Sequence, residues 1–564
     1  MRPFDQGTHE RTRSSHARAR RIAWLMPLLL VLAFATAAWA GYHRLVLGGD
    51  QYDDSFITYR YAANLADGRG LTFNSYERVN SASSLLYACV LAGARRIGLA
   101  RLELVAAAMG ALAGAGGLLV AYRLVLLLGG SPILGFIVLL PVAVSGAWTG
   151  WSASGMETIP YAALATAFVA AFALRRRLLV LFLLSACLLT RPEGVLLFIA
   201  AMAVELYLHG RSSALLVALA CTGGVVLGLL YGFYDLYYGS WLPQAAELKT
   251  ISPYYAPGPL AQLRSTARFC LGGFGALTAG AVAPLFHGLR RRDGPATEAD
   301  SPARLRLTTN VFLILTAGSL VLGPHSDLMR YAVPALPLLG VASAAAWLGV
   351  RATLRPRART LIALLFVAIS IGESAVDGRR THAFFVEWSR HQAARRSLGR
   401  WLDENAPDKA LVISSDLGAI AYEALRLDFY DMVGLLSRGP LEAARRNRWD
   451  LVWSDLGRRK PQYLCDTVLP DGEPQALHVL REPYRYFRSV QADTDPALYP
   501  SRSVIRSIDA GQYKFEIAAL RWGNSARGDD AGAGDGVESL PPSRMRGRRI
   551  DPEEPPPKCR CIAR

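Results

Sequence analysis

Two adjacent carboxylates, Asp53 and Asp54, follow shortly after the first long apolar segment, 22–41. Neighbouring acids tend to separate their pKa values, which suits general acid–base chemistry. One carboxylate would act as general base on an acceptor hydroxyl, while the other would orient the acceptor, hold a divalent metal or maintain the charge state of the first. Alternatively, both acids only cap the helix that follows them, since carboxylates are favoured at helix N-termini.

Other charged residues stand at the ends of apolar segments, where charge is costly and often functional. Glu157 begins one such segment and would be either a supporting acid or a helix cap. Arg191 and Glu193 flank a proline between two segments. They would either pair with each other as a structural bridge or take part in catalysis directly.

Two cations are candidates for binding a phosphate group. Lys249 is either a phosphate contact or an interfacial lysine whose stem lies along apolar surface. Arg330, which precedes Tyr331, has the same two interpretations, and arginine can bind a phosphate through two parallel hydrogen bonds. His325 precedes Arg330 by five residues, although a loop histidine with ordinary partners is the simpler interpretation.

Tyr59 and Arg60 follow the acid pair by a helical turn or so and would reach the same ligand. The sequence has no glycine-rich nucleotide loop with a Walker lysine and no zinc-type spacing of cysteines. It therefore predicts no structural metal site and no nucleotide cofactor.

The elements that must position these residues are membrane helices. The chain has 564 residues, of which 52% are hydrophobic, and its apolar runs have the length that a helix needs to cross a bilayer. The net charge of +17 comes from arginine clusters beside these runs, which favours membrane orientation over nucleic-acid binding. We predict about eleven spans, at 22–41, 103–125, 132–148, 158–174, 178–190, 194–209, 213–235, 266–288, 307–323, 331–350 and 360–375.

The topology depends on segment 84–99, which would either span the membrane or lie flat as an interfacial helix. If it lies flat, most arginine clusters fall on the cytoplasmic side with the N-terminal arm, as the positive-inside rule prefers. The loops that mix acids, bases and aromatic residues then all lie on the outer side. This predicts one reaction site that faces away from the cytoplasm, in a multi-pass protein of the inner (plasma) membrane.

The hydropathy divides the chain into four parts. Residues 1–21 form a basic cytoplasmic arm, and 22–376 form the transmembrane domain with a first outer loop at 42–102. Residues 377–523 are predicted to be a soluble, extracytoplasmic α/β domain with strands at 410–414 and 514–522, and 524–564 a disordered tail. The first apolar run is interpreted as an uncleaved span, although a signal peptide is the alternative.

The first-loop motif, which runs from Asp53 to Leu65 and continues through 68–79, resembles that of the GT-C glycosyltransferases. The similarity is greatest to bacterial terminal β-(1→2)-arabinofuranosyltransferases and covers roughly residues 20–435. Short motifs recur in similar places at 154–158, 191–194, 242–249, 330–334 and 415–419. The chain departs from the family pattern at 80–84 and at Gln244, where asparagine is more usual.

The resemblance implies a GT-C fold with a C-terminal soluble α/β domain and a polyprenyl-phosphate sugar as donor, the sugar being arabinofuranose or another pentose or hexose. It also implies inverting transfer at the outer face to a cell-envelope glycan or lipid. By analogy the base is Asp53 or Asp54, the supporting acid is Glu157, and Lys249 and Arg330 contact the phosphate. The alternative from another class is a transporter or flippase of a lipid-linked saccharide, which would more often show repeat symmetry and broken helices.

Overall fold

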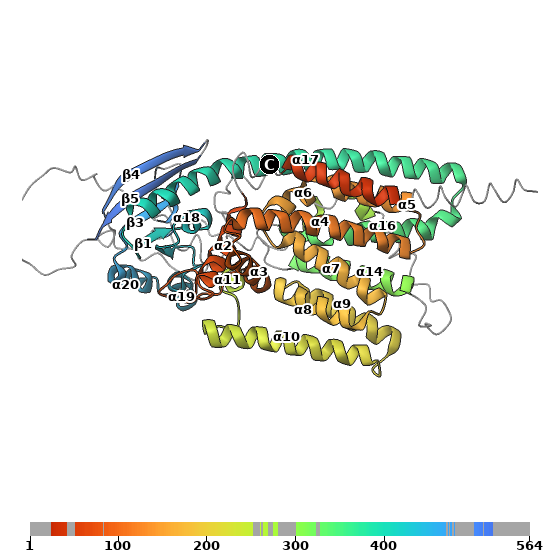
Figure 1. Ribbon diagram of the computed structural model, residues 1–564, viewed down its shortest axis with the longest axis horizontal. Coiled ribbons are helices and arrows are strands. Elements are labelled where there is room, and N and C mark those ends of the chain that lie inside the picture. The colour runs from red at the N-terminus through yellow and green to blue at the C-terminus, as the bar shows by residue number, and fades with distance from the viewer. Residues whose placement is uncertain are drawn as a thin grey trace, which may run out of the picture.

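The computed structural model describes residues 24–41, 51–82, 84–251, 260, 263–264, 266–268, 274–279, 301–322, 328–469, 472, 474–476, 479, 501–510 and 513–522. A bundle of helices forms one part of the molecule and a small sheet domain forms the other (Figure 1). One helix, α17 (Pro356–Asn405), runs along both parts. The predicted domain boundary at 377 therefore falls within a continuous helix.

Five described helical segments are long and apolar enough to cross a membrane. They are Trp24–Gly41, α4 (Leu102–Leu127), α10 (Ala214–Tyr238), Arg330–Val350 and the Pro356–Thr381 part of α17. The Arg330–Val350 segment combines the end of α15 (Leu328–Ala332), the 3-10 turn η1 (Val333–Ala335) and α16 (Leu336–Val350). Helix α14 (Ser301–Leu322) and three shorter apolar helices, α7 (Thr158–Ala173), α8 (Arg177–Thr190) and α9 (Gly194–His209), also belong to the described bundle.

The bundle exposes large apolar side chains, as a lipid-facing surface requires. Leu112 on α4, Leu178 and Phe182 on α8, Leu236 on α10 and Leu364 on α17 are all exposed. A soluble protein rarely leaves so much apolar surface in water. The chain is therefore a multi-pass membrane protein, as predicted, although the predicted span 266–288 lies largely outside the described residues.

One predicted span is broken. Helices α5 (Pro132–Val144) and α6 (Gly146–Ala153) meet at an angle of 58°. Helix α17 provides a hydrogen-bond acceptor for the N-terminus of α6. The backbone N–H of Ala147 donates to the Asp377 carboxylate over 3.0 Å. Close packing against α4 needs a glycine, since a Cβ at Gly110 would overlap with the backbone carbonyl of Ser152. This bend places the loop 154–157 at the end of the helix bundle.

Three short helices, α2 (Asp53–Ala66), α3 (Leu85–Arg96) and α11 (Gln244–Ile251), lie between the bundle and the sheet domain (Figure 1). With 12 residues, α3 is too short to cross a bilayer, in agreement with the prediction that segment 84–99 does not span. These helices carry several of the predicted site residues.

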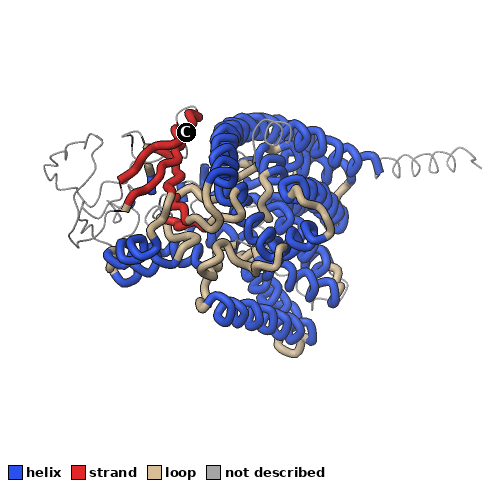
Figure 2. The backbone as a smooth tube through the Cα atoms, turned by 60° about the vertical axis from the view of Figure 1, so that its left-hand side comes forward, coloured by secondary structure: helices blue, strands red, loops and turns tan. Residues whose placement is uncertain are grey.

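The C-terminal domain contains a five-stranded sheet in the order β2-β1-β3-β5-β4, seen as the red strands of Figure 2. Strand β1 (Leu411–Ser414) is parallel to both β2 (Asp428–Asp431) and β3 (Tyr463–Val468), while β5 (Tyr513–Arg521) is antiparallel to β3 and β4 (Ser501–Ala510). Helices α18 (Gly418–Glu423), α19 (Arg438–Arg446) and α20 (Asp450–Arg459) connect the parallel strands. The predicted strands at 410–414 and 514–522 coincide with β1 and β5.

Candidate functional site

Seven of the predicted site residues meet where α2, α11 and α15 approach the loops that precede α7 and α9. We call this group the charge cluster. It consists of Asp54, Glu157, Arg191, Glu193, Lys249, Arg330 and Tyr331. These residues are spread over nearly 280 positions of the chain, and only the folding of five separate segments brings them together.

Glu157 is the buried centre of the charge cluster. Its side chain is only 1% exposed, and Oε1 accepts from Nη1 of Arg191 over 2.8 Å and from Nη2 of Arg330 over 3.4 Å. A carboxylate buried to this degree needs such partners, because removing an isolated charge from water is very costly. Glu157 thus holds two guanidinium groups in place below the surface of the site.

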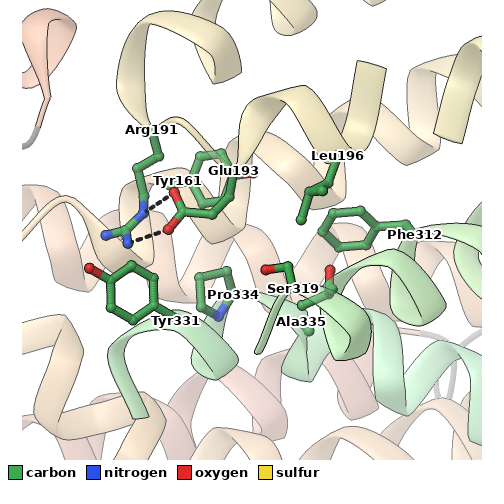
Figure 3. Close-up of a pocket in the computed structure, with 10 residues that line it drawn as sticks. Tyr161, Arg191, Glu193, Leu196, Phe312, Ser319, Tyr331, Pro334 and Ala335 are labelled. Carbon is green, nitrogen blue, oxygen red and sulfur yellow. Dashed lines mark hydrogen bonds and ion pairs between the residues drawn. The ribbon is translucent and has the colours of Figure 1, made fainter. Parts of the chain in front are cut away.

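Arg191 and Glu193 form the bridge that the sequence allows. Nε and Nη2 of Arg191 donate to the two carboxylate oxygens of Glu193 over 3.0 and 2.9 Å (Figure 3). Burial lowers the pKa of Arg191, but the carboxylates of Glu193 and Glu157 outweigh this effect and raise it. The guanidinium also lies 5.1 Å from the ring centroid of Tyr331, a cation–π contact. Arg191 is therefore a permanent positive charge at the site.

Asp54 is the most exposed acid of the charge cluster. Its side chain is 44% exposed, and Oδ2 accepts from Nη1 of Arg330 over 2.9 Å. The surrounding protein still removes much of the water from the carboxylate, which raises the pKa of Asp54, while Arg330 opposes that increase. A carboxylate with a raised pKa is better suited to accept a proton near neutral pH.

Two cations of the cluster remain able to contact an anion. Nζ of Lys249 donates to the Tyr331 hydroxyl over 2.6 Å and lies 5.1 Å from the centroid of that ring. Nε of Arg330 is buried and has no hydrogen-bond partner among the described residues. An unsatisfied donor of this kind is rare and is expected to be paired when a ligand is bound.

A small cavity extends from the cluster between α7, α9 and α14. Its volume is about 10 Å³, and its lining includes Tyr161, Arg191, Glu193, Phe312 and Tyr331 (Figure 3). A space of this size holds about one water molecule. The buried hydroxyl of Tyr161 has no hydrogen-bond partner among the described residues, so it is a natural partner for that water.

Asp53 lies in a different environment from its neighbour. Oδ1 accepts from Nε2 of Gln392 and from the backbone N–H of Ala419, both over 2.9 Å, and Oδ2 accepts from the N–H of Gly418 over 3.0 Å. The carboxylate is buried, which raises the pKa of Asp53, and Arg395 opposes that increase. The structure therefore separates the two acids: Asp54 faces the charge cluster and Asp53 faces the C-terminal domain.

Tyr59 and Arg60 are not brought to the charge cluster. The hydroxyl of Tyr59 donates to Oε1 of Gln51 over 2.5 Å, and Arg60 donates to backbone carbonyls that include those of Ala424 and Leu427, over 3.1 and 2.5 Å. Arg60 follows Asp53 by seven residues, so both lie on the same face of α2 and point to the C-terminal domain. Burial lowers the pKa of Arg60 to about 9.

Gln392 and Arg395, which support Asp53, were missed by sequence reasoning. Both lie in an ordinary polar stretch of an amphipathic helix, and no local signal distinguishes them from solvated residues. His325 lies outside the described residues. Within the part of the chain that the structure describes, no three His, Cys, Asp or Glu side chains are grouped so that they could hold a metal ion.

Comparison with known proteins identifies solved structures that share this fold. Residues 385–517 match a family described as "Domain of unknown function (DUF8728)". No curated protein matches the sequence. The structure resembles ArnT from Cupriavidus metallidurans in two crystal structures, both at 14% sequence identity. The one bound to undecaprenyl phosphate has a TM-score of 0.50, with 88% of this chain and 98% of that chain covered.

The apo structure of ArnT has a TM-score of 0.51, with 87% of this chain and 97% of that chain covered. The chain therefore has an ArnT-like GT-C fold, which confirms the predicted fold class. The described residues include five candidate spans, or six if the bent pair α5 and α6 counts as one. The predicted number of about eleven stays a prediction.

Proposed function

We propose that the protein is an integral-membrane glycosyltransferase that moves a sugar from a polyprenyl-phosphate donor to a cell-envelope glycan or lipid. The observation that carries this proposal is the exposed carboxylate of Asp54, held 2.9 Å from a buried arginine in a cluster with two further cations. An accessible base beside fixed positive charges is what transfer from a phosphate leaving group needs. The shared fold with a protein crystallised with undecaprenyl phosphate supports the class of donor.

In the proposed reaction Asp54 takes the proton from an acceptor hydroxyl. The acceptor oxygen forms a bond to the anomeric carbon, and the bond from that carbon to the phosphate oxygen breaks on the opposite side. The electron pair leaves with the polyprenyl phosphate, so the configuration is inverted. Arg330 and Lys249 stabilise the negative charge on the leaving group.

The remaining members of the cluster support these groups. Glu157 holds Arg330 and Arg191 through the hydrogen bonds described above and has no exposed oxygen surface to offer an acceptor. We propose that the cluster and the C-terminal domain lie on the outer face of the inner membrane. The donor sugar to test first is arabinofuranose, on the strength of the first-loop resemblance.

The test is transfer from radiolabelled polyprenyl-phosphate arabinose, with a mannose donor in parallel, by purified wild-type protein and by Asp54→Asn. Loss of a general base typically slows a reaction by about 10²–10⁴-fold, and we expect that reduction. Asp67→Asn is the matched control, because Asp67 caps the other end of α2 and lies at the surface. Full activity of folded Asp54→Asn would show that Asp54 is not the base. Failure of the wild-type protein to consume either donor would show that the proposed sugars are wrong.

A further inference from the structure

The C-terminal domain encloses the carboxylate of Asp53 with its own donors. Two of the three hydrogen bonds come from consecutive backbone N–H groups at the start of α18, and the third comes from Gln392 on α17. Gln392 also donates to the backbone carbonyl of Gln51 over 3.2 Å, so it contacts the chain on both sides of Tyr52. The domain thus binds Asp53 in addition to Arg60, another residue of α2, which donates to it.

A chain of polar contacts ties this link to the sheet. Nη1 of Arg395 donates to Oε1 of Gln392 over 3.1 Å, and Nε of the same residue lies 2.7 Å from Oδ2 of Asp416. The hydroxyl of Thr467 on β3 donates to the same Asp416 oxygen over 2.9 Å. The position of the Asp53 carboxylate is therefore set by the carboxyl ends of β1 and β3.

That place in the sheet is where open α/β folds receive ligands. Strand β1 has parallel neighbours on both sides, and the chain passes from β1 to β2 in one direction and then to β3 in the other. The crevice at the carboxyl ends of strands at such a reversal is the usual ligand site. Here the Asp53 carboxylate accepts hydrogen bonds from two backbone N–H groups that follow β1.

The domain holds a second element of the site in a similar way. Nε2 of Gln244, at the start of α11, donates to the carbonyls of Gly434 and Ser437, both over 2.7 Å. Glu247 on the same helix is paired with Arg445 of α19. Lys249, near the other end of α11, contributes its ammonium group to the charge cluster.

We propose that the C-terminal domain is a positioning part of the transferase, which sets the place of Asp54 by binding the adjacent Asp53 and the place of Lys249 by binding α11. Asp53, Gln392 and Arg395 are then positioning residues, and the base is Asp54. This inference rests on the proposed function. It also gives the matched family of unknown function, residues 385–517, a defined role in this chain.

The test displaces Asp53 without altering any residue of the charge cluster. A methyl group added at Gly418 would overlap with both the backbone carbonyl oxygen and the carboxylate of Asp53, whereas one added at Gly457 of α20 meets nothing within 4 Å. We expect Gly418→Ala to lower kcat by about 100-fold, the effect of a displacement of about 1 Å at a reaction site. The KM for the donor should stay close to wild type, the unfolding temperature should fall because the Asp53 backbone must shift, and Gly457→Ala should match wild type throughout.

Two further variants keep the proposal testable if Gly418→Ala does not fold. Gln392→Ala removes one hydrogen bond to Asp53 and should show the same selective loss of kcat. Ser75→Ala removes a different contact between the first loop and the domain, the hydroxyl bond to Asp428 over 2.5 Å, and should leave kcat unchanged. Equal losses in all three variants, or an unchanged kcat in folded Gly418→Ala and Gln392→Ala, would overturn the proposal.

Amide hydrogen exchange in the full-length protein separates this proposal from the proposed function. Asp53→Asn should accelerate exchange at the N–H groups of Gly418 and Ala419, whichever sugar the protein transfers. Unchanged exchange would show that the domain does not hold Asp53, even if transfer is confirmed. Faster exchange in a protein that transfers no sugar from any polyprenyl-phosphate donor would instead refute the proposed function and leave the contact intact.

Discussion

Glu157→Gln should destabilise the folded protein through the loss of one buried negative charge. The wild-type side chain is 1% exposed and binds two guanidinium groups, Arg191 over 2.8 Å and Arg330 over 3.4 Å. Removing one partner of a buried pair costs about 3–5 kcal/mol, because the remaining charge is left uncompensated. Arg191 keeps Glu193 and Arg330 keeps Asp54, so we expect the lower end, about 3 kcal/mol.

The control is an ion pair of the same length at the surface. Arg426 Nη1 lies 2.8 Å from Asp408 Oδ1, but the Asp408 side chain is 83% exposed. Exposed pairs contribute about 0–1 kcal/mol, so Asp408→Asn should have little effect. Denaturant unfolding of both variants in the same detergent measures the difference. Equal and small losses for the two variants would show that burial does not decide the strength of these pairs and would refute the reasoning.

Three other changes test the site and the domain. Arg330→Met removes the cation that opposes the raised pKa of Asp54, so that pKa should rise further and the acid limb of the kcat/KM profile should move to higher pH. A shift to lower pH would contradict the assignment of Asp54 as the base. Lys249→Gln should raise the donor KM by about ten-fold or more, since a hydrogen bond to a charged group contributes about 1.5–3 kcal/mol, and an unchanged KM would exclude a phosphate contact. Burial raises the pKa of Asp466 in the sheet to about 7, so the folded state keeps a proton that the unfolded chain loses at the ordinary pKa of an aspartate, about 4. Stability from this group therefore falls as pH rises between about 4 and 7, and Asp466→Asn should reduce that slope in unfolding measured across this range.

The sequence was sufficient for those features that depend on local composition. Apolar runs of bilayer length predicted membrane helices, and the described spans lie at predicted positions. The buried run at 410–414 predicted a strand that the structure has as β1. The loops on one side of the predicted topology contributed Asp54, Glu157, Arg191, Lys249 and Arg330, and these residues do lie together in the structure.

Contacts between distant segments could not be predicted in the same way. Asp53 and Asp54 are neighbours with the same chemistry, and only their angular positions on α2 direct one to the C-terminal domain and the other to the cluster. Arg60 is a plausible ligand contact by sequence, but its guanidinium binds carbonyls more than 360 residues away. Such assignments depend on which surfaces meet, and a single sequence carries no local signal for that.

The continuity of α17 links the reaction site to the thickness of the bilayer. The helix has 50 residues and continues beyond its apolar part, which ends at Thr381, for about 36 Å. Helices adjust to thicker or thinner membranes by tilting, and a change of about 10° would move the far end of this segment by about 6 Å. Because Gln392 and Arg395 lie on that segment and hold Asp53, such a tilt would also move Asp54, the acid that we propose as the base, relative to the cations of the charge cluster.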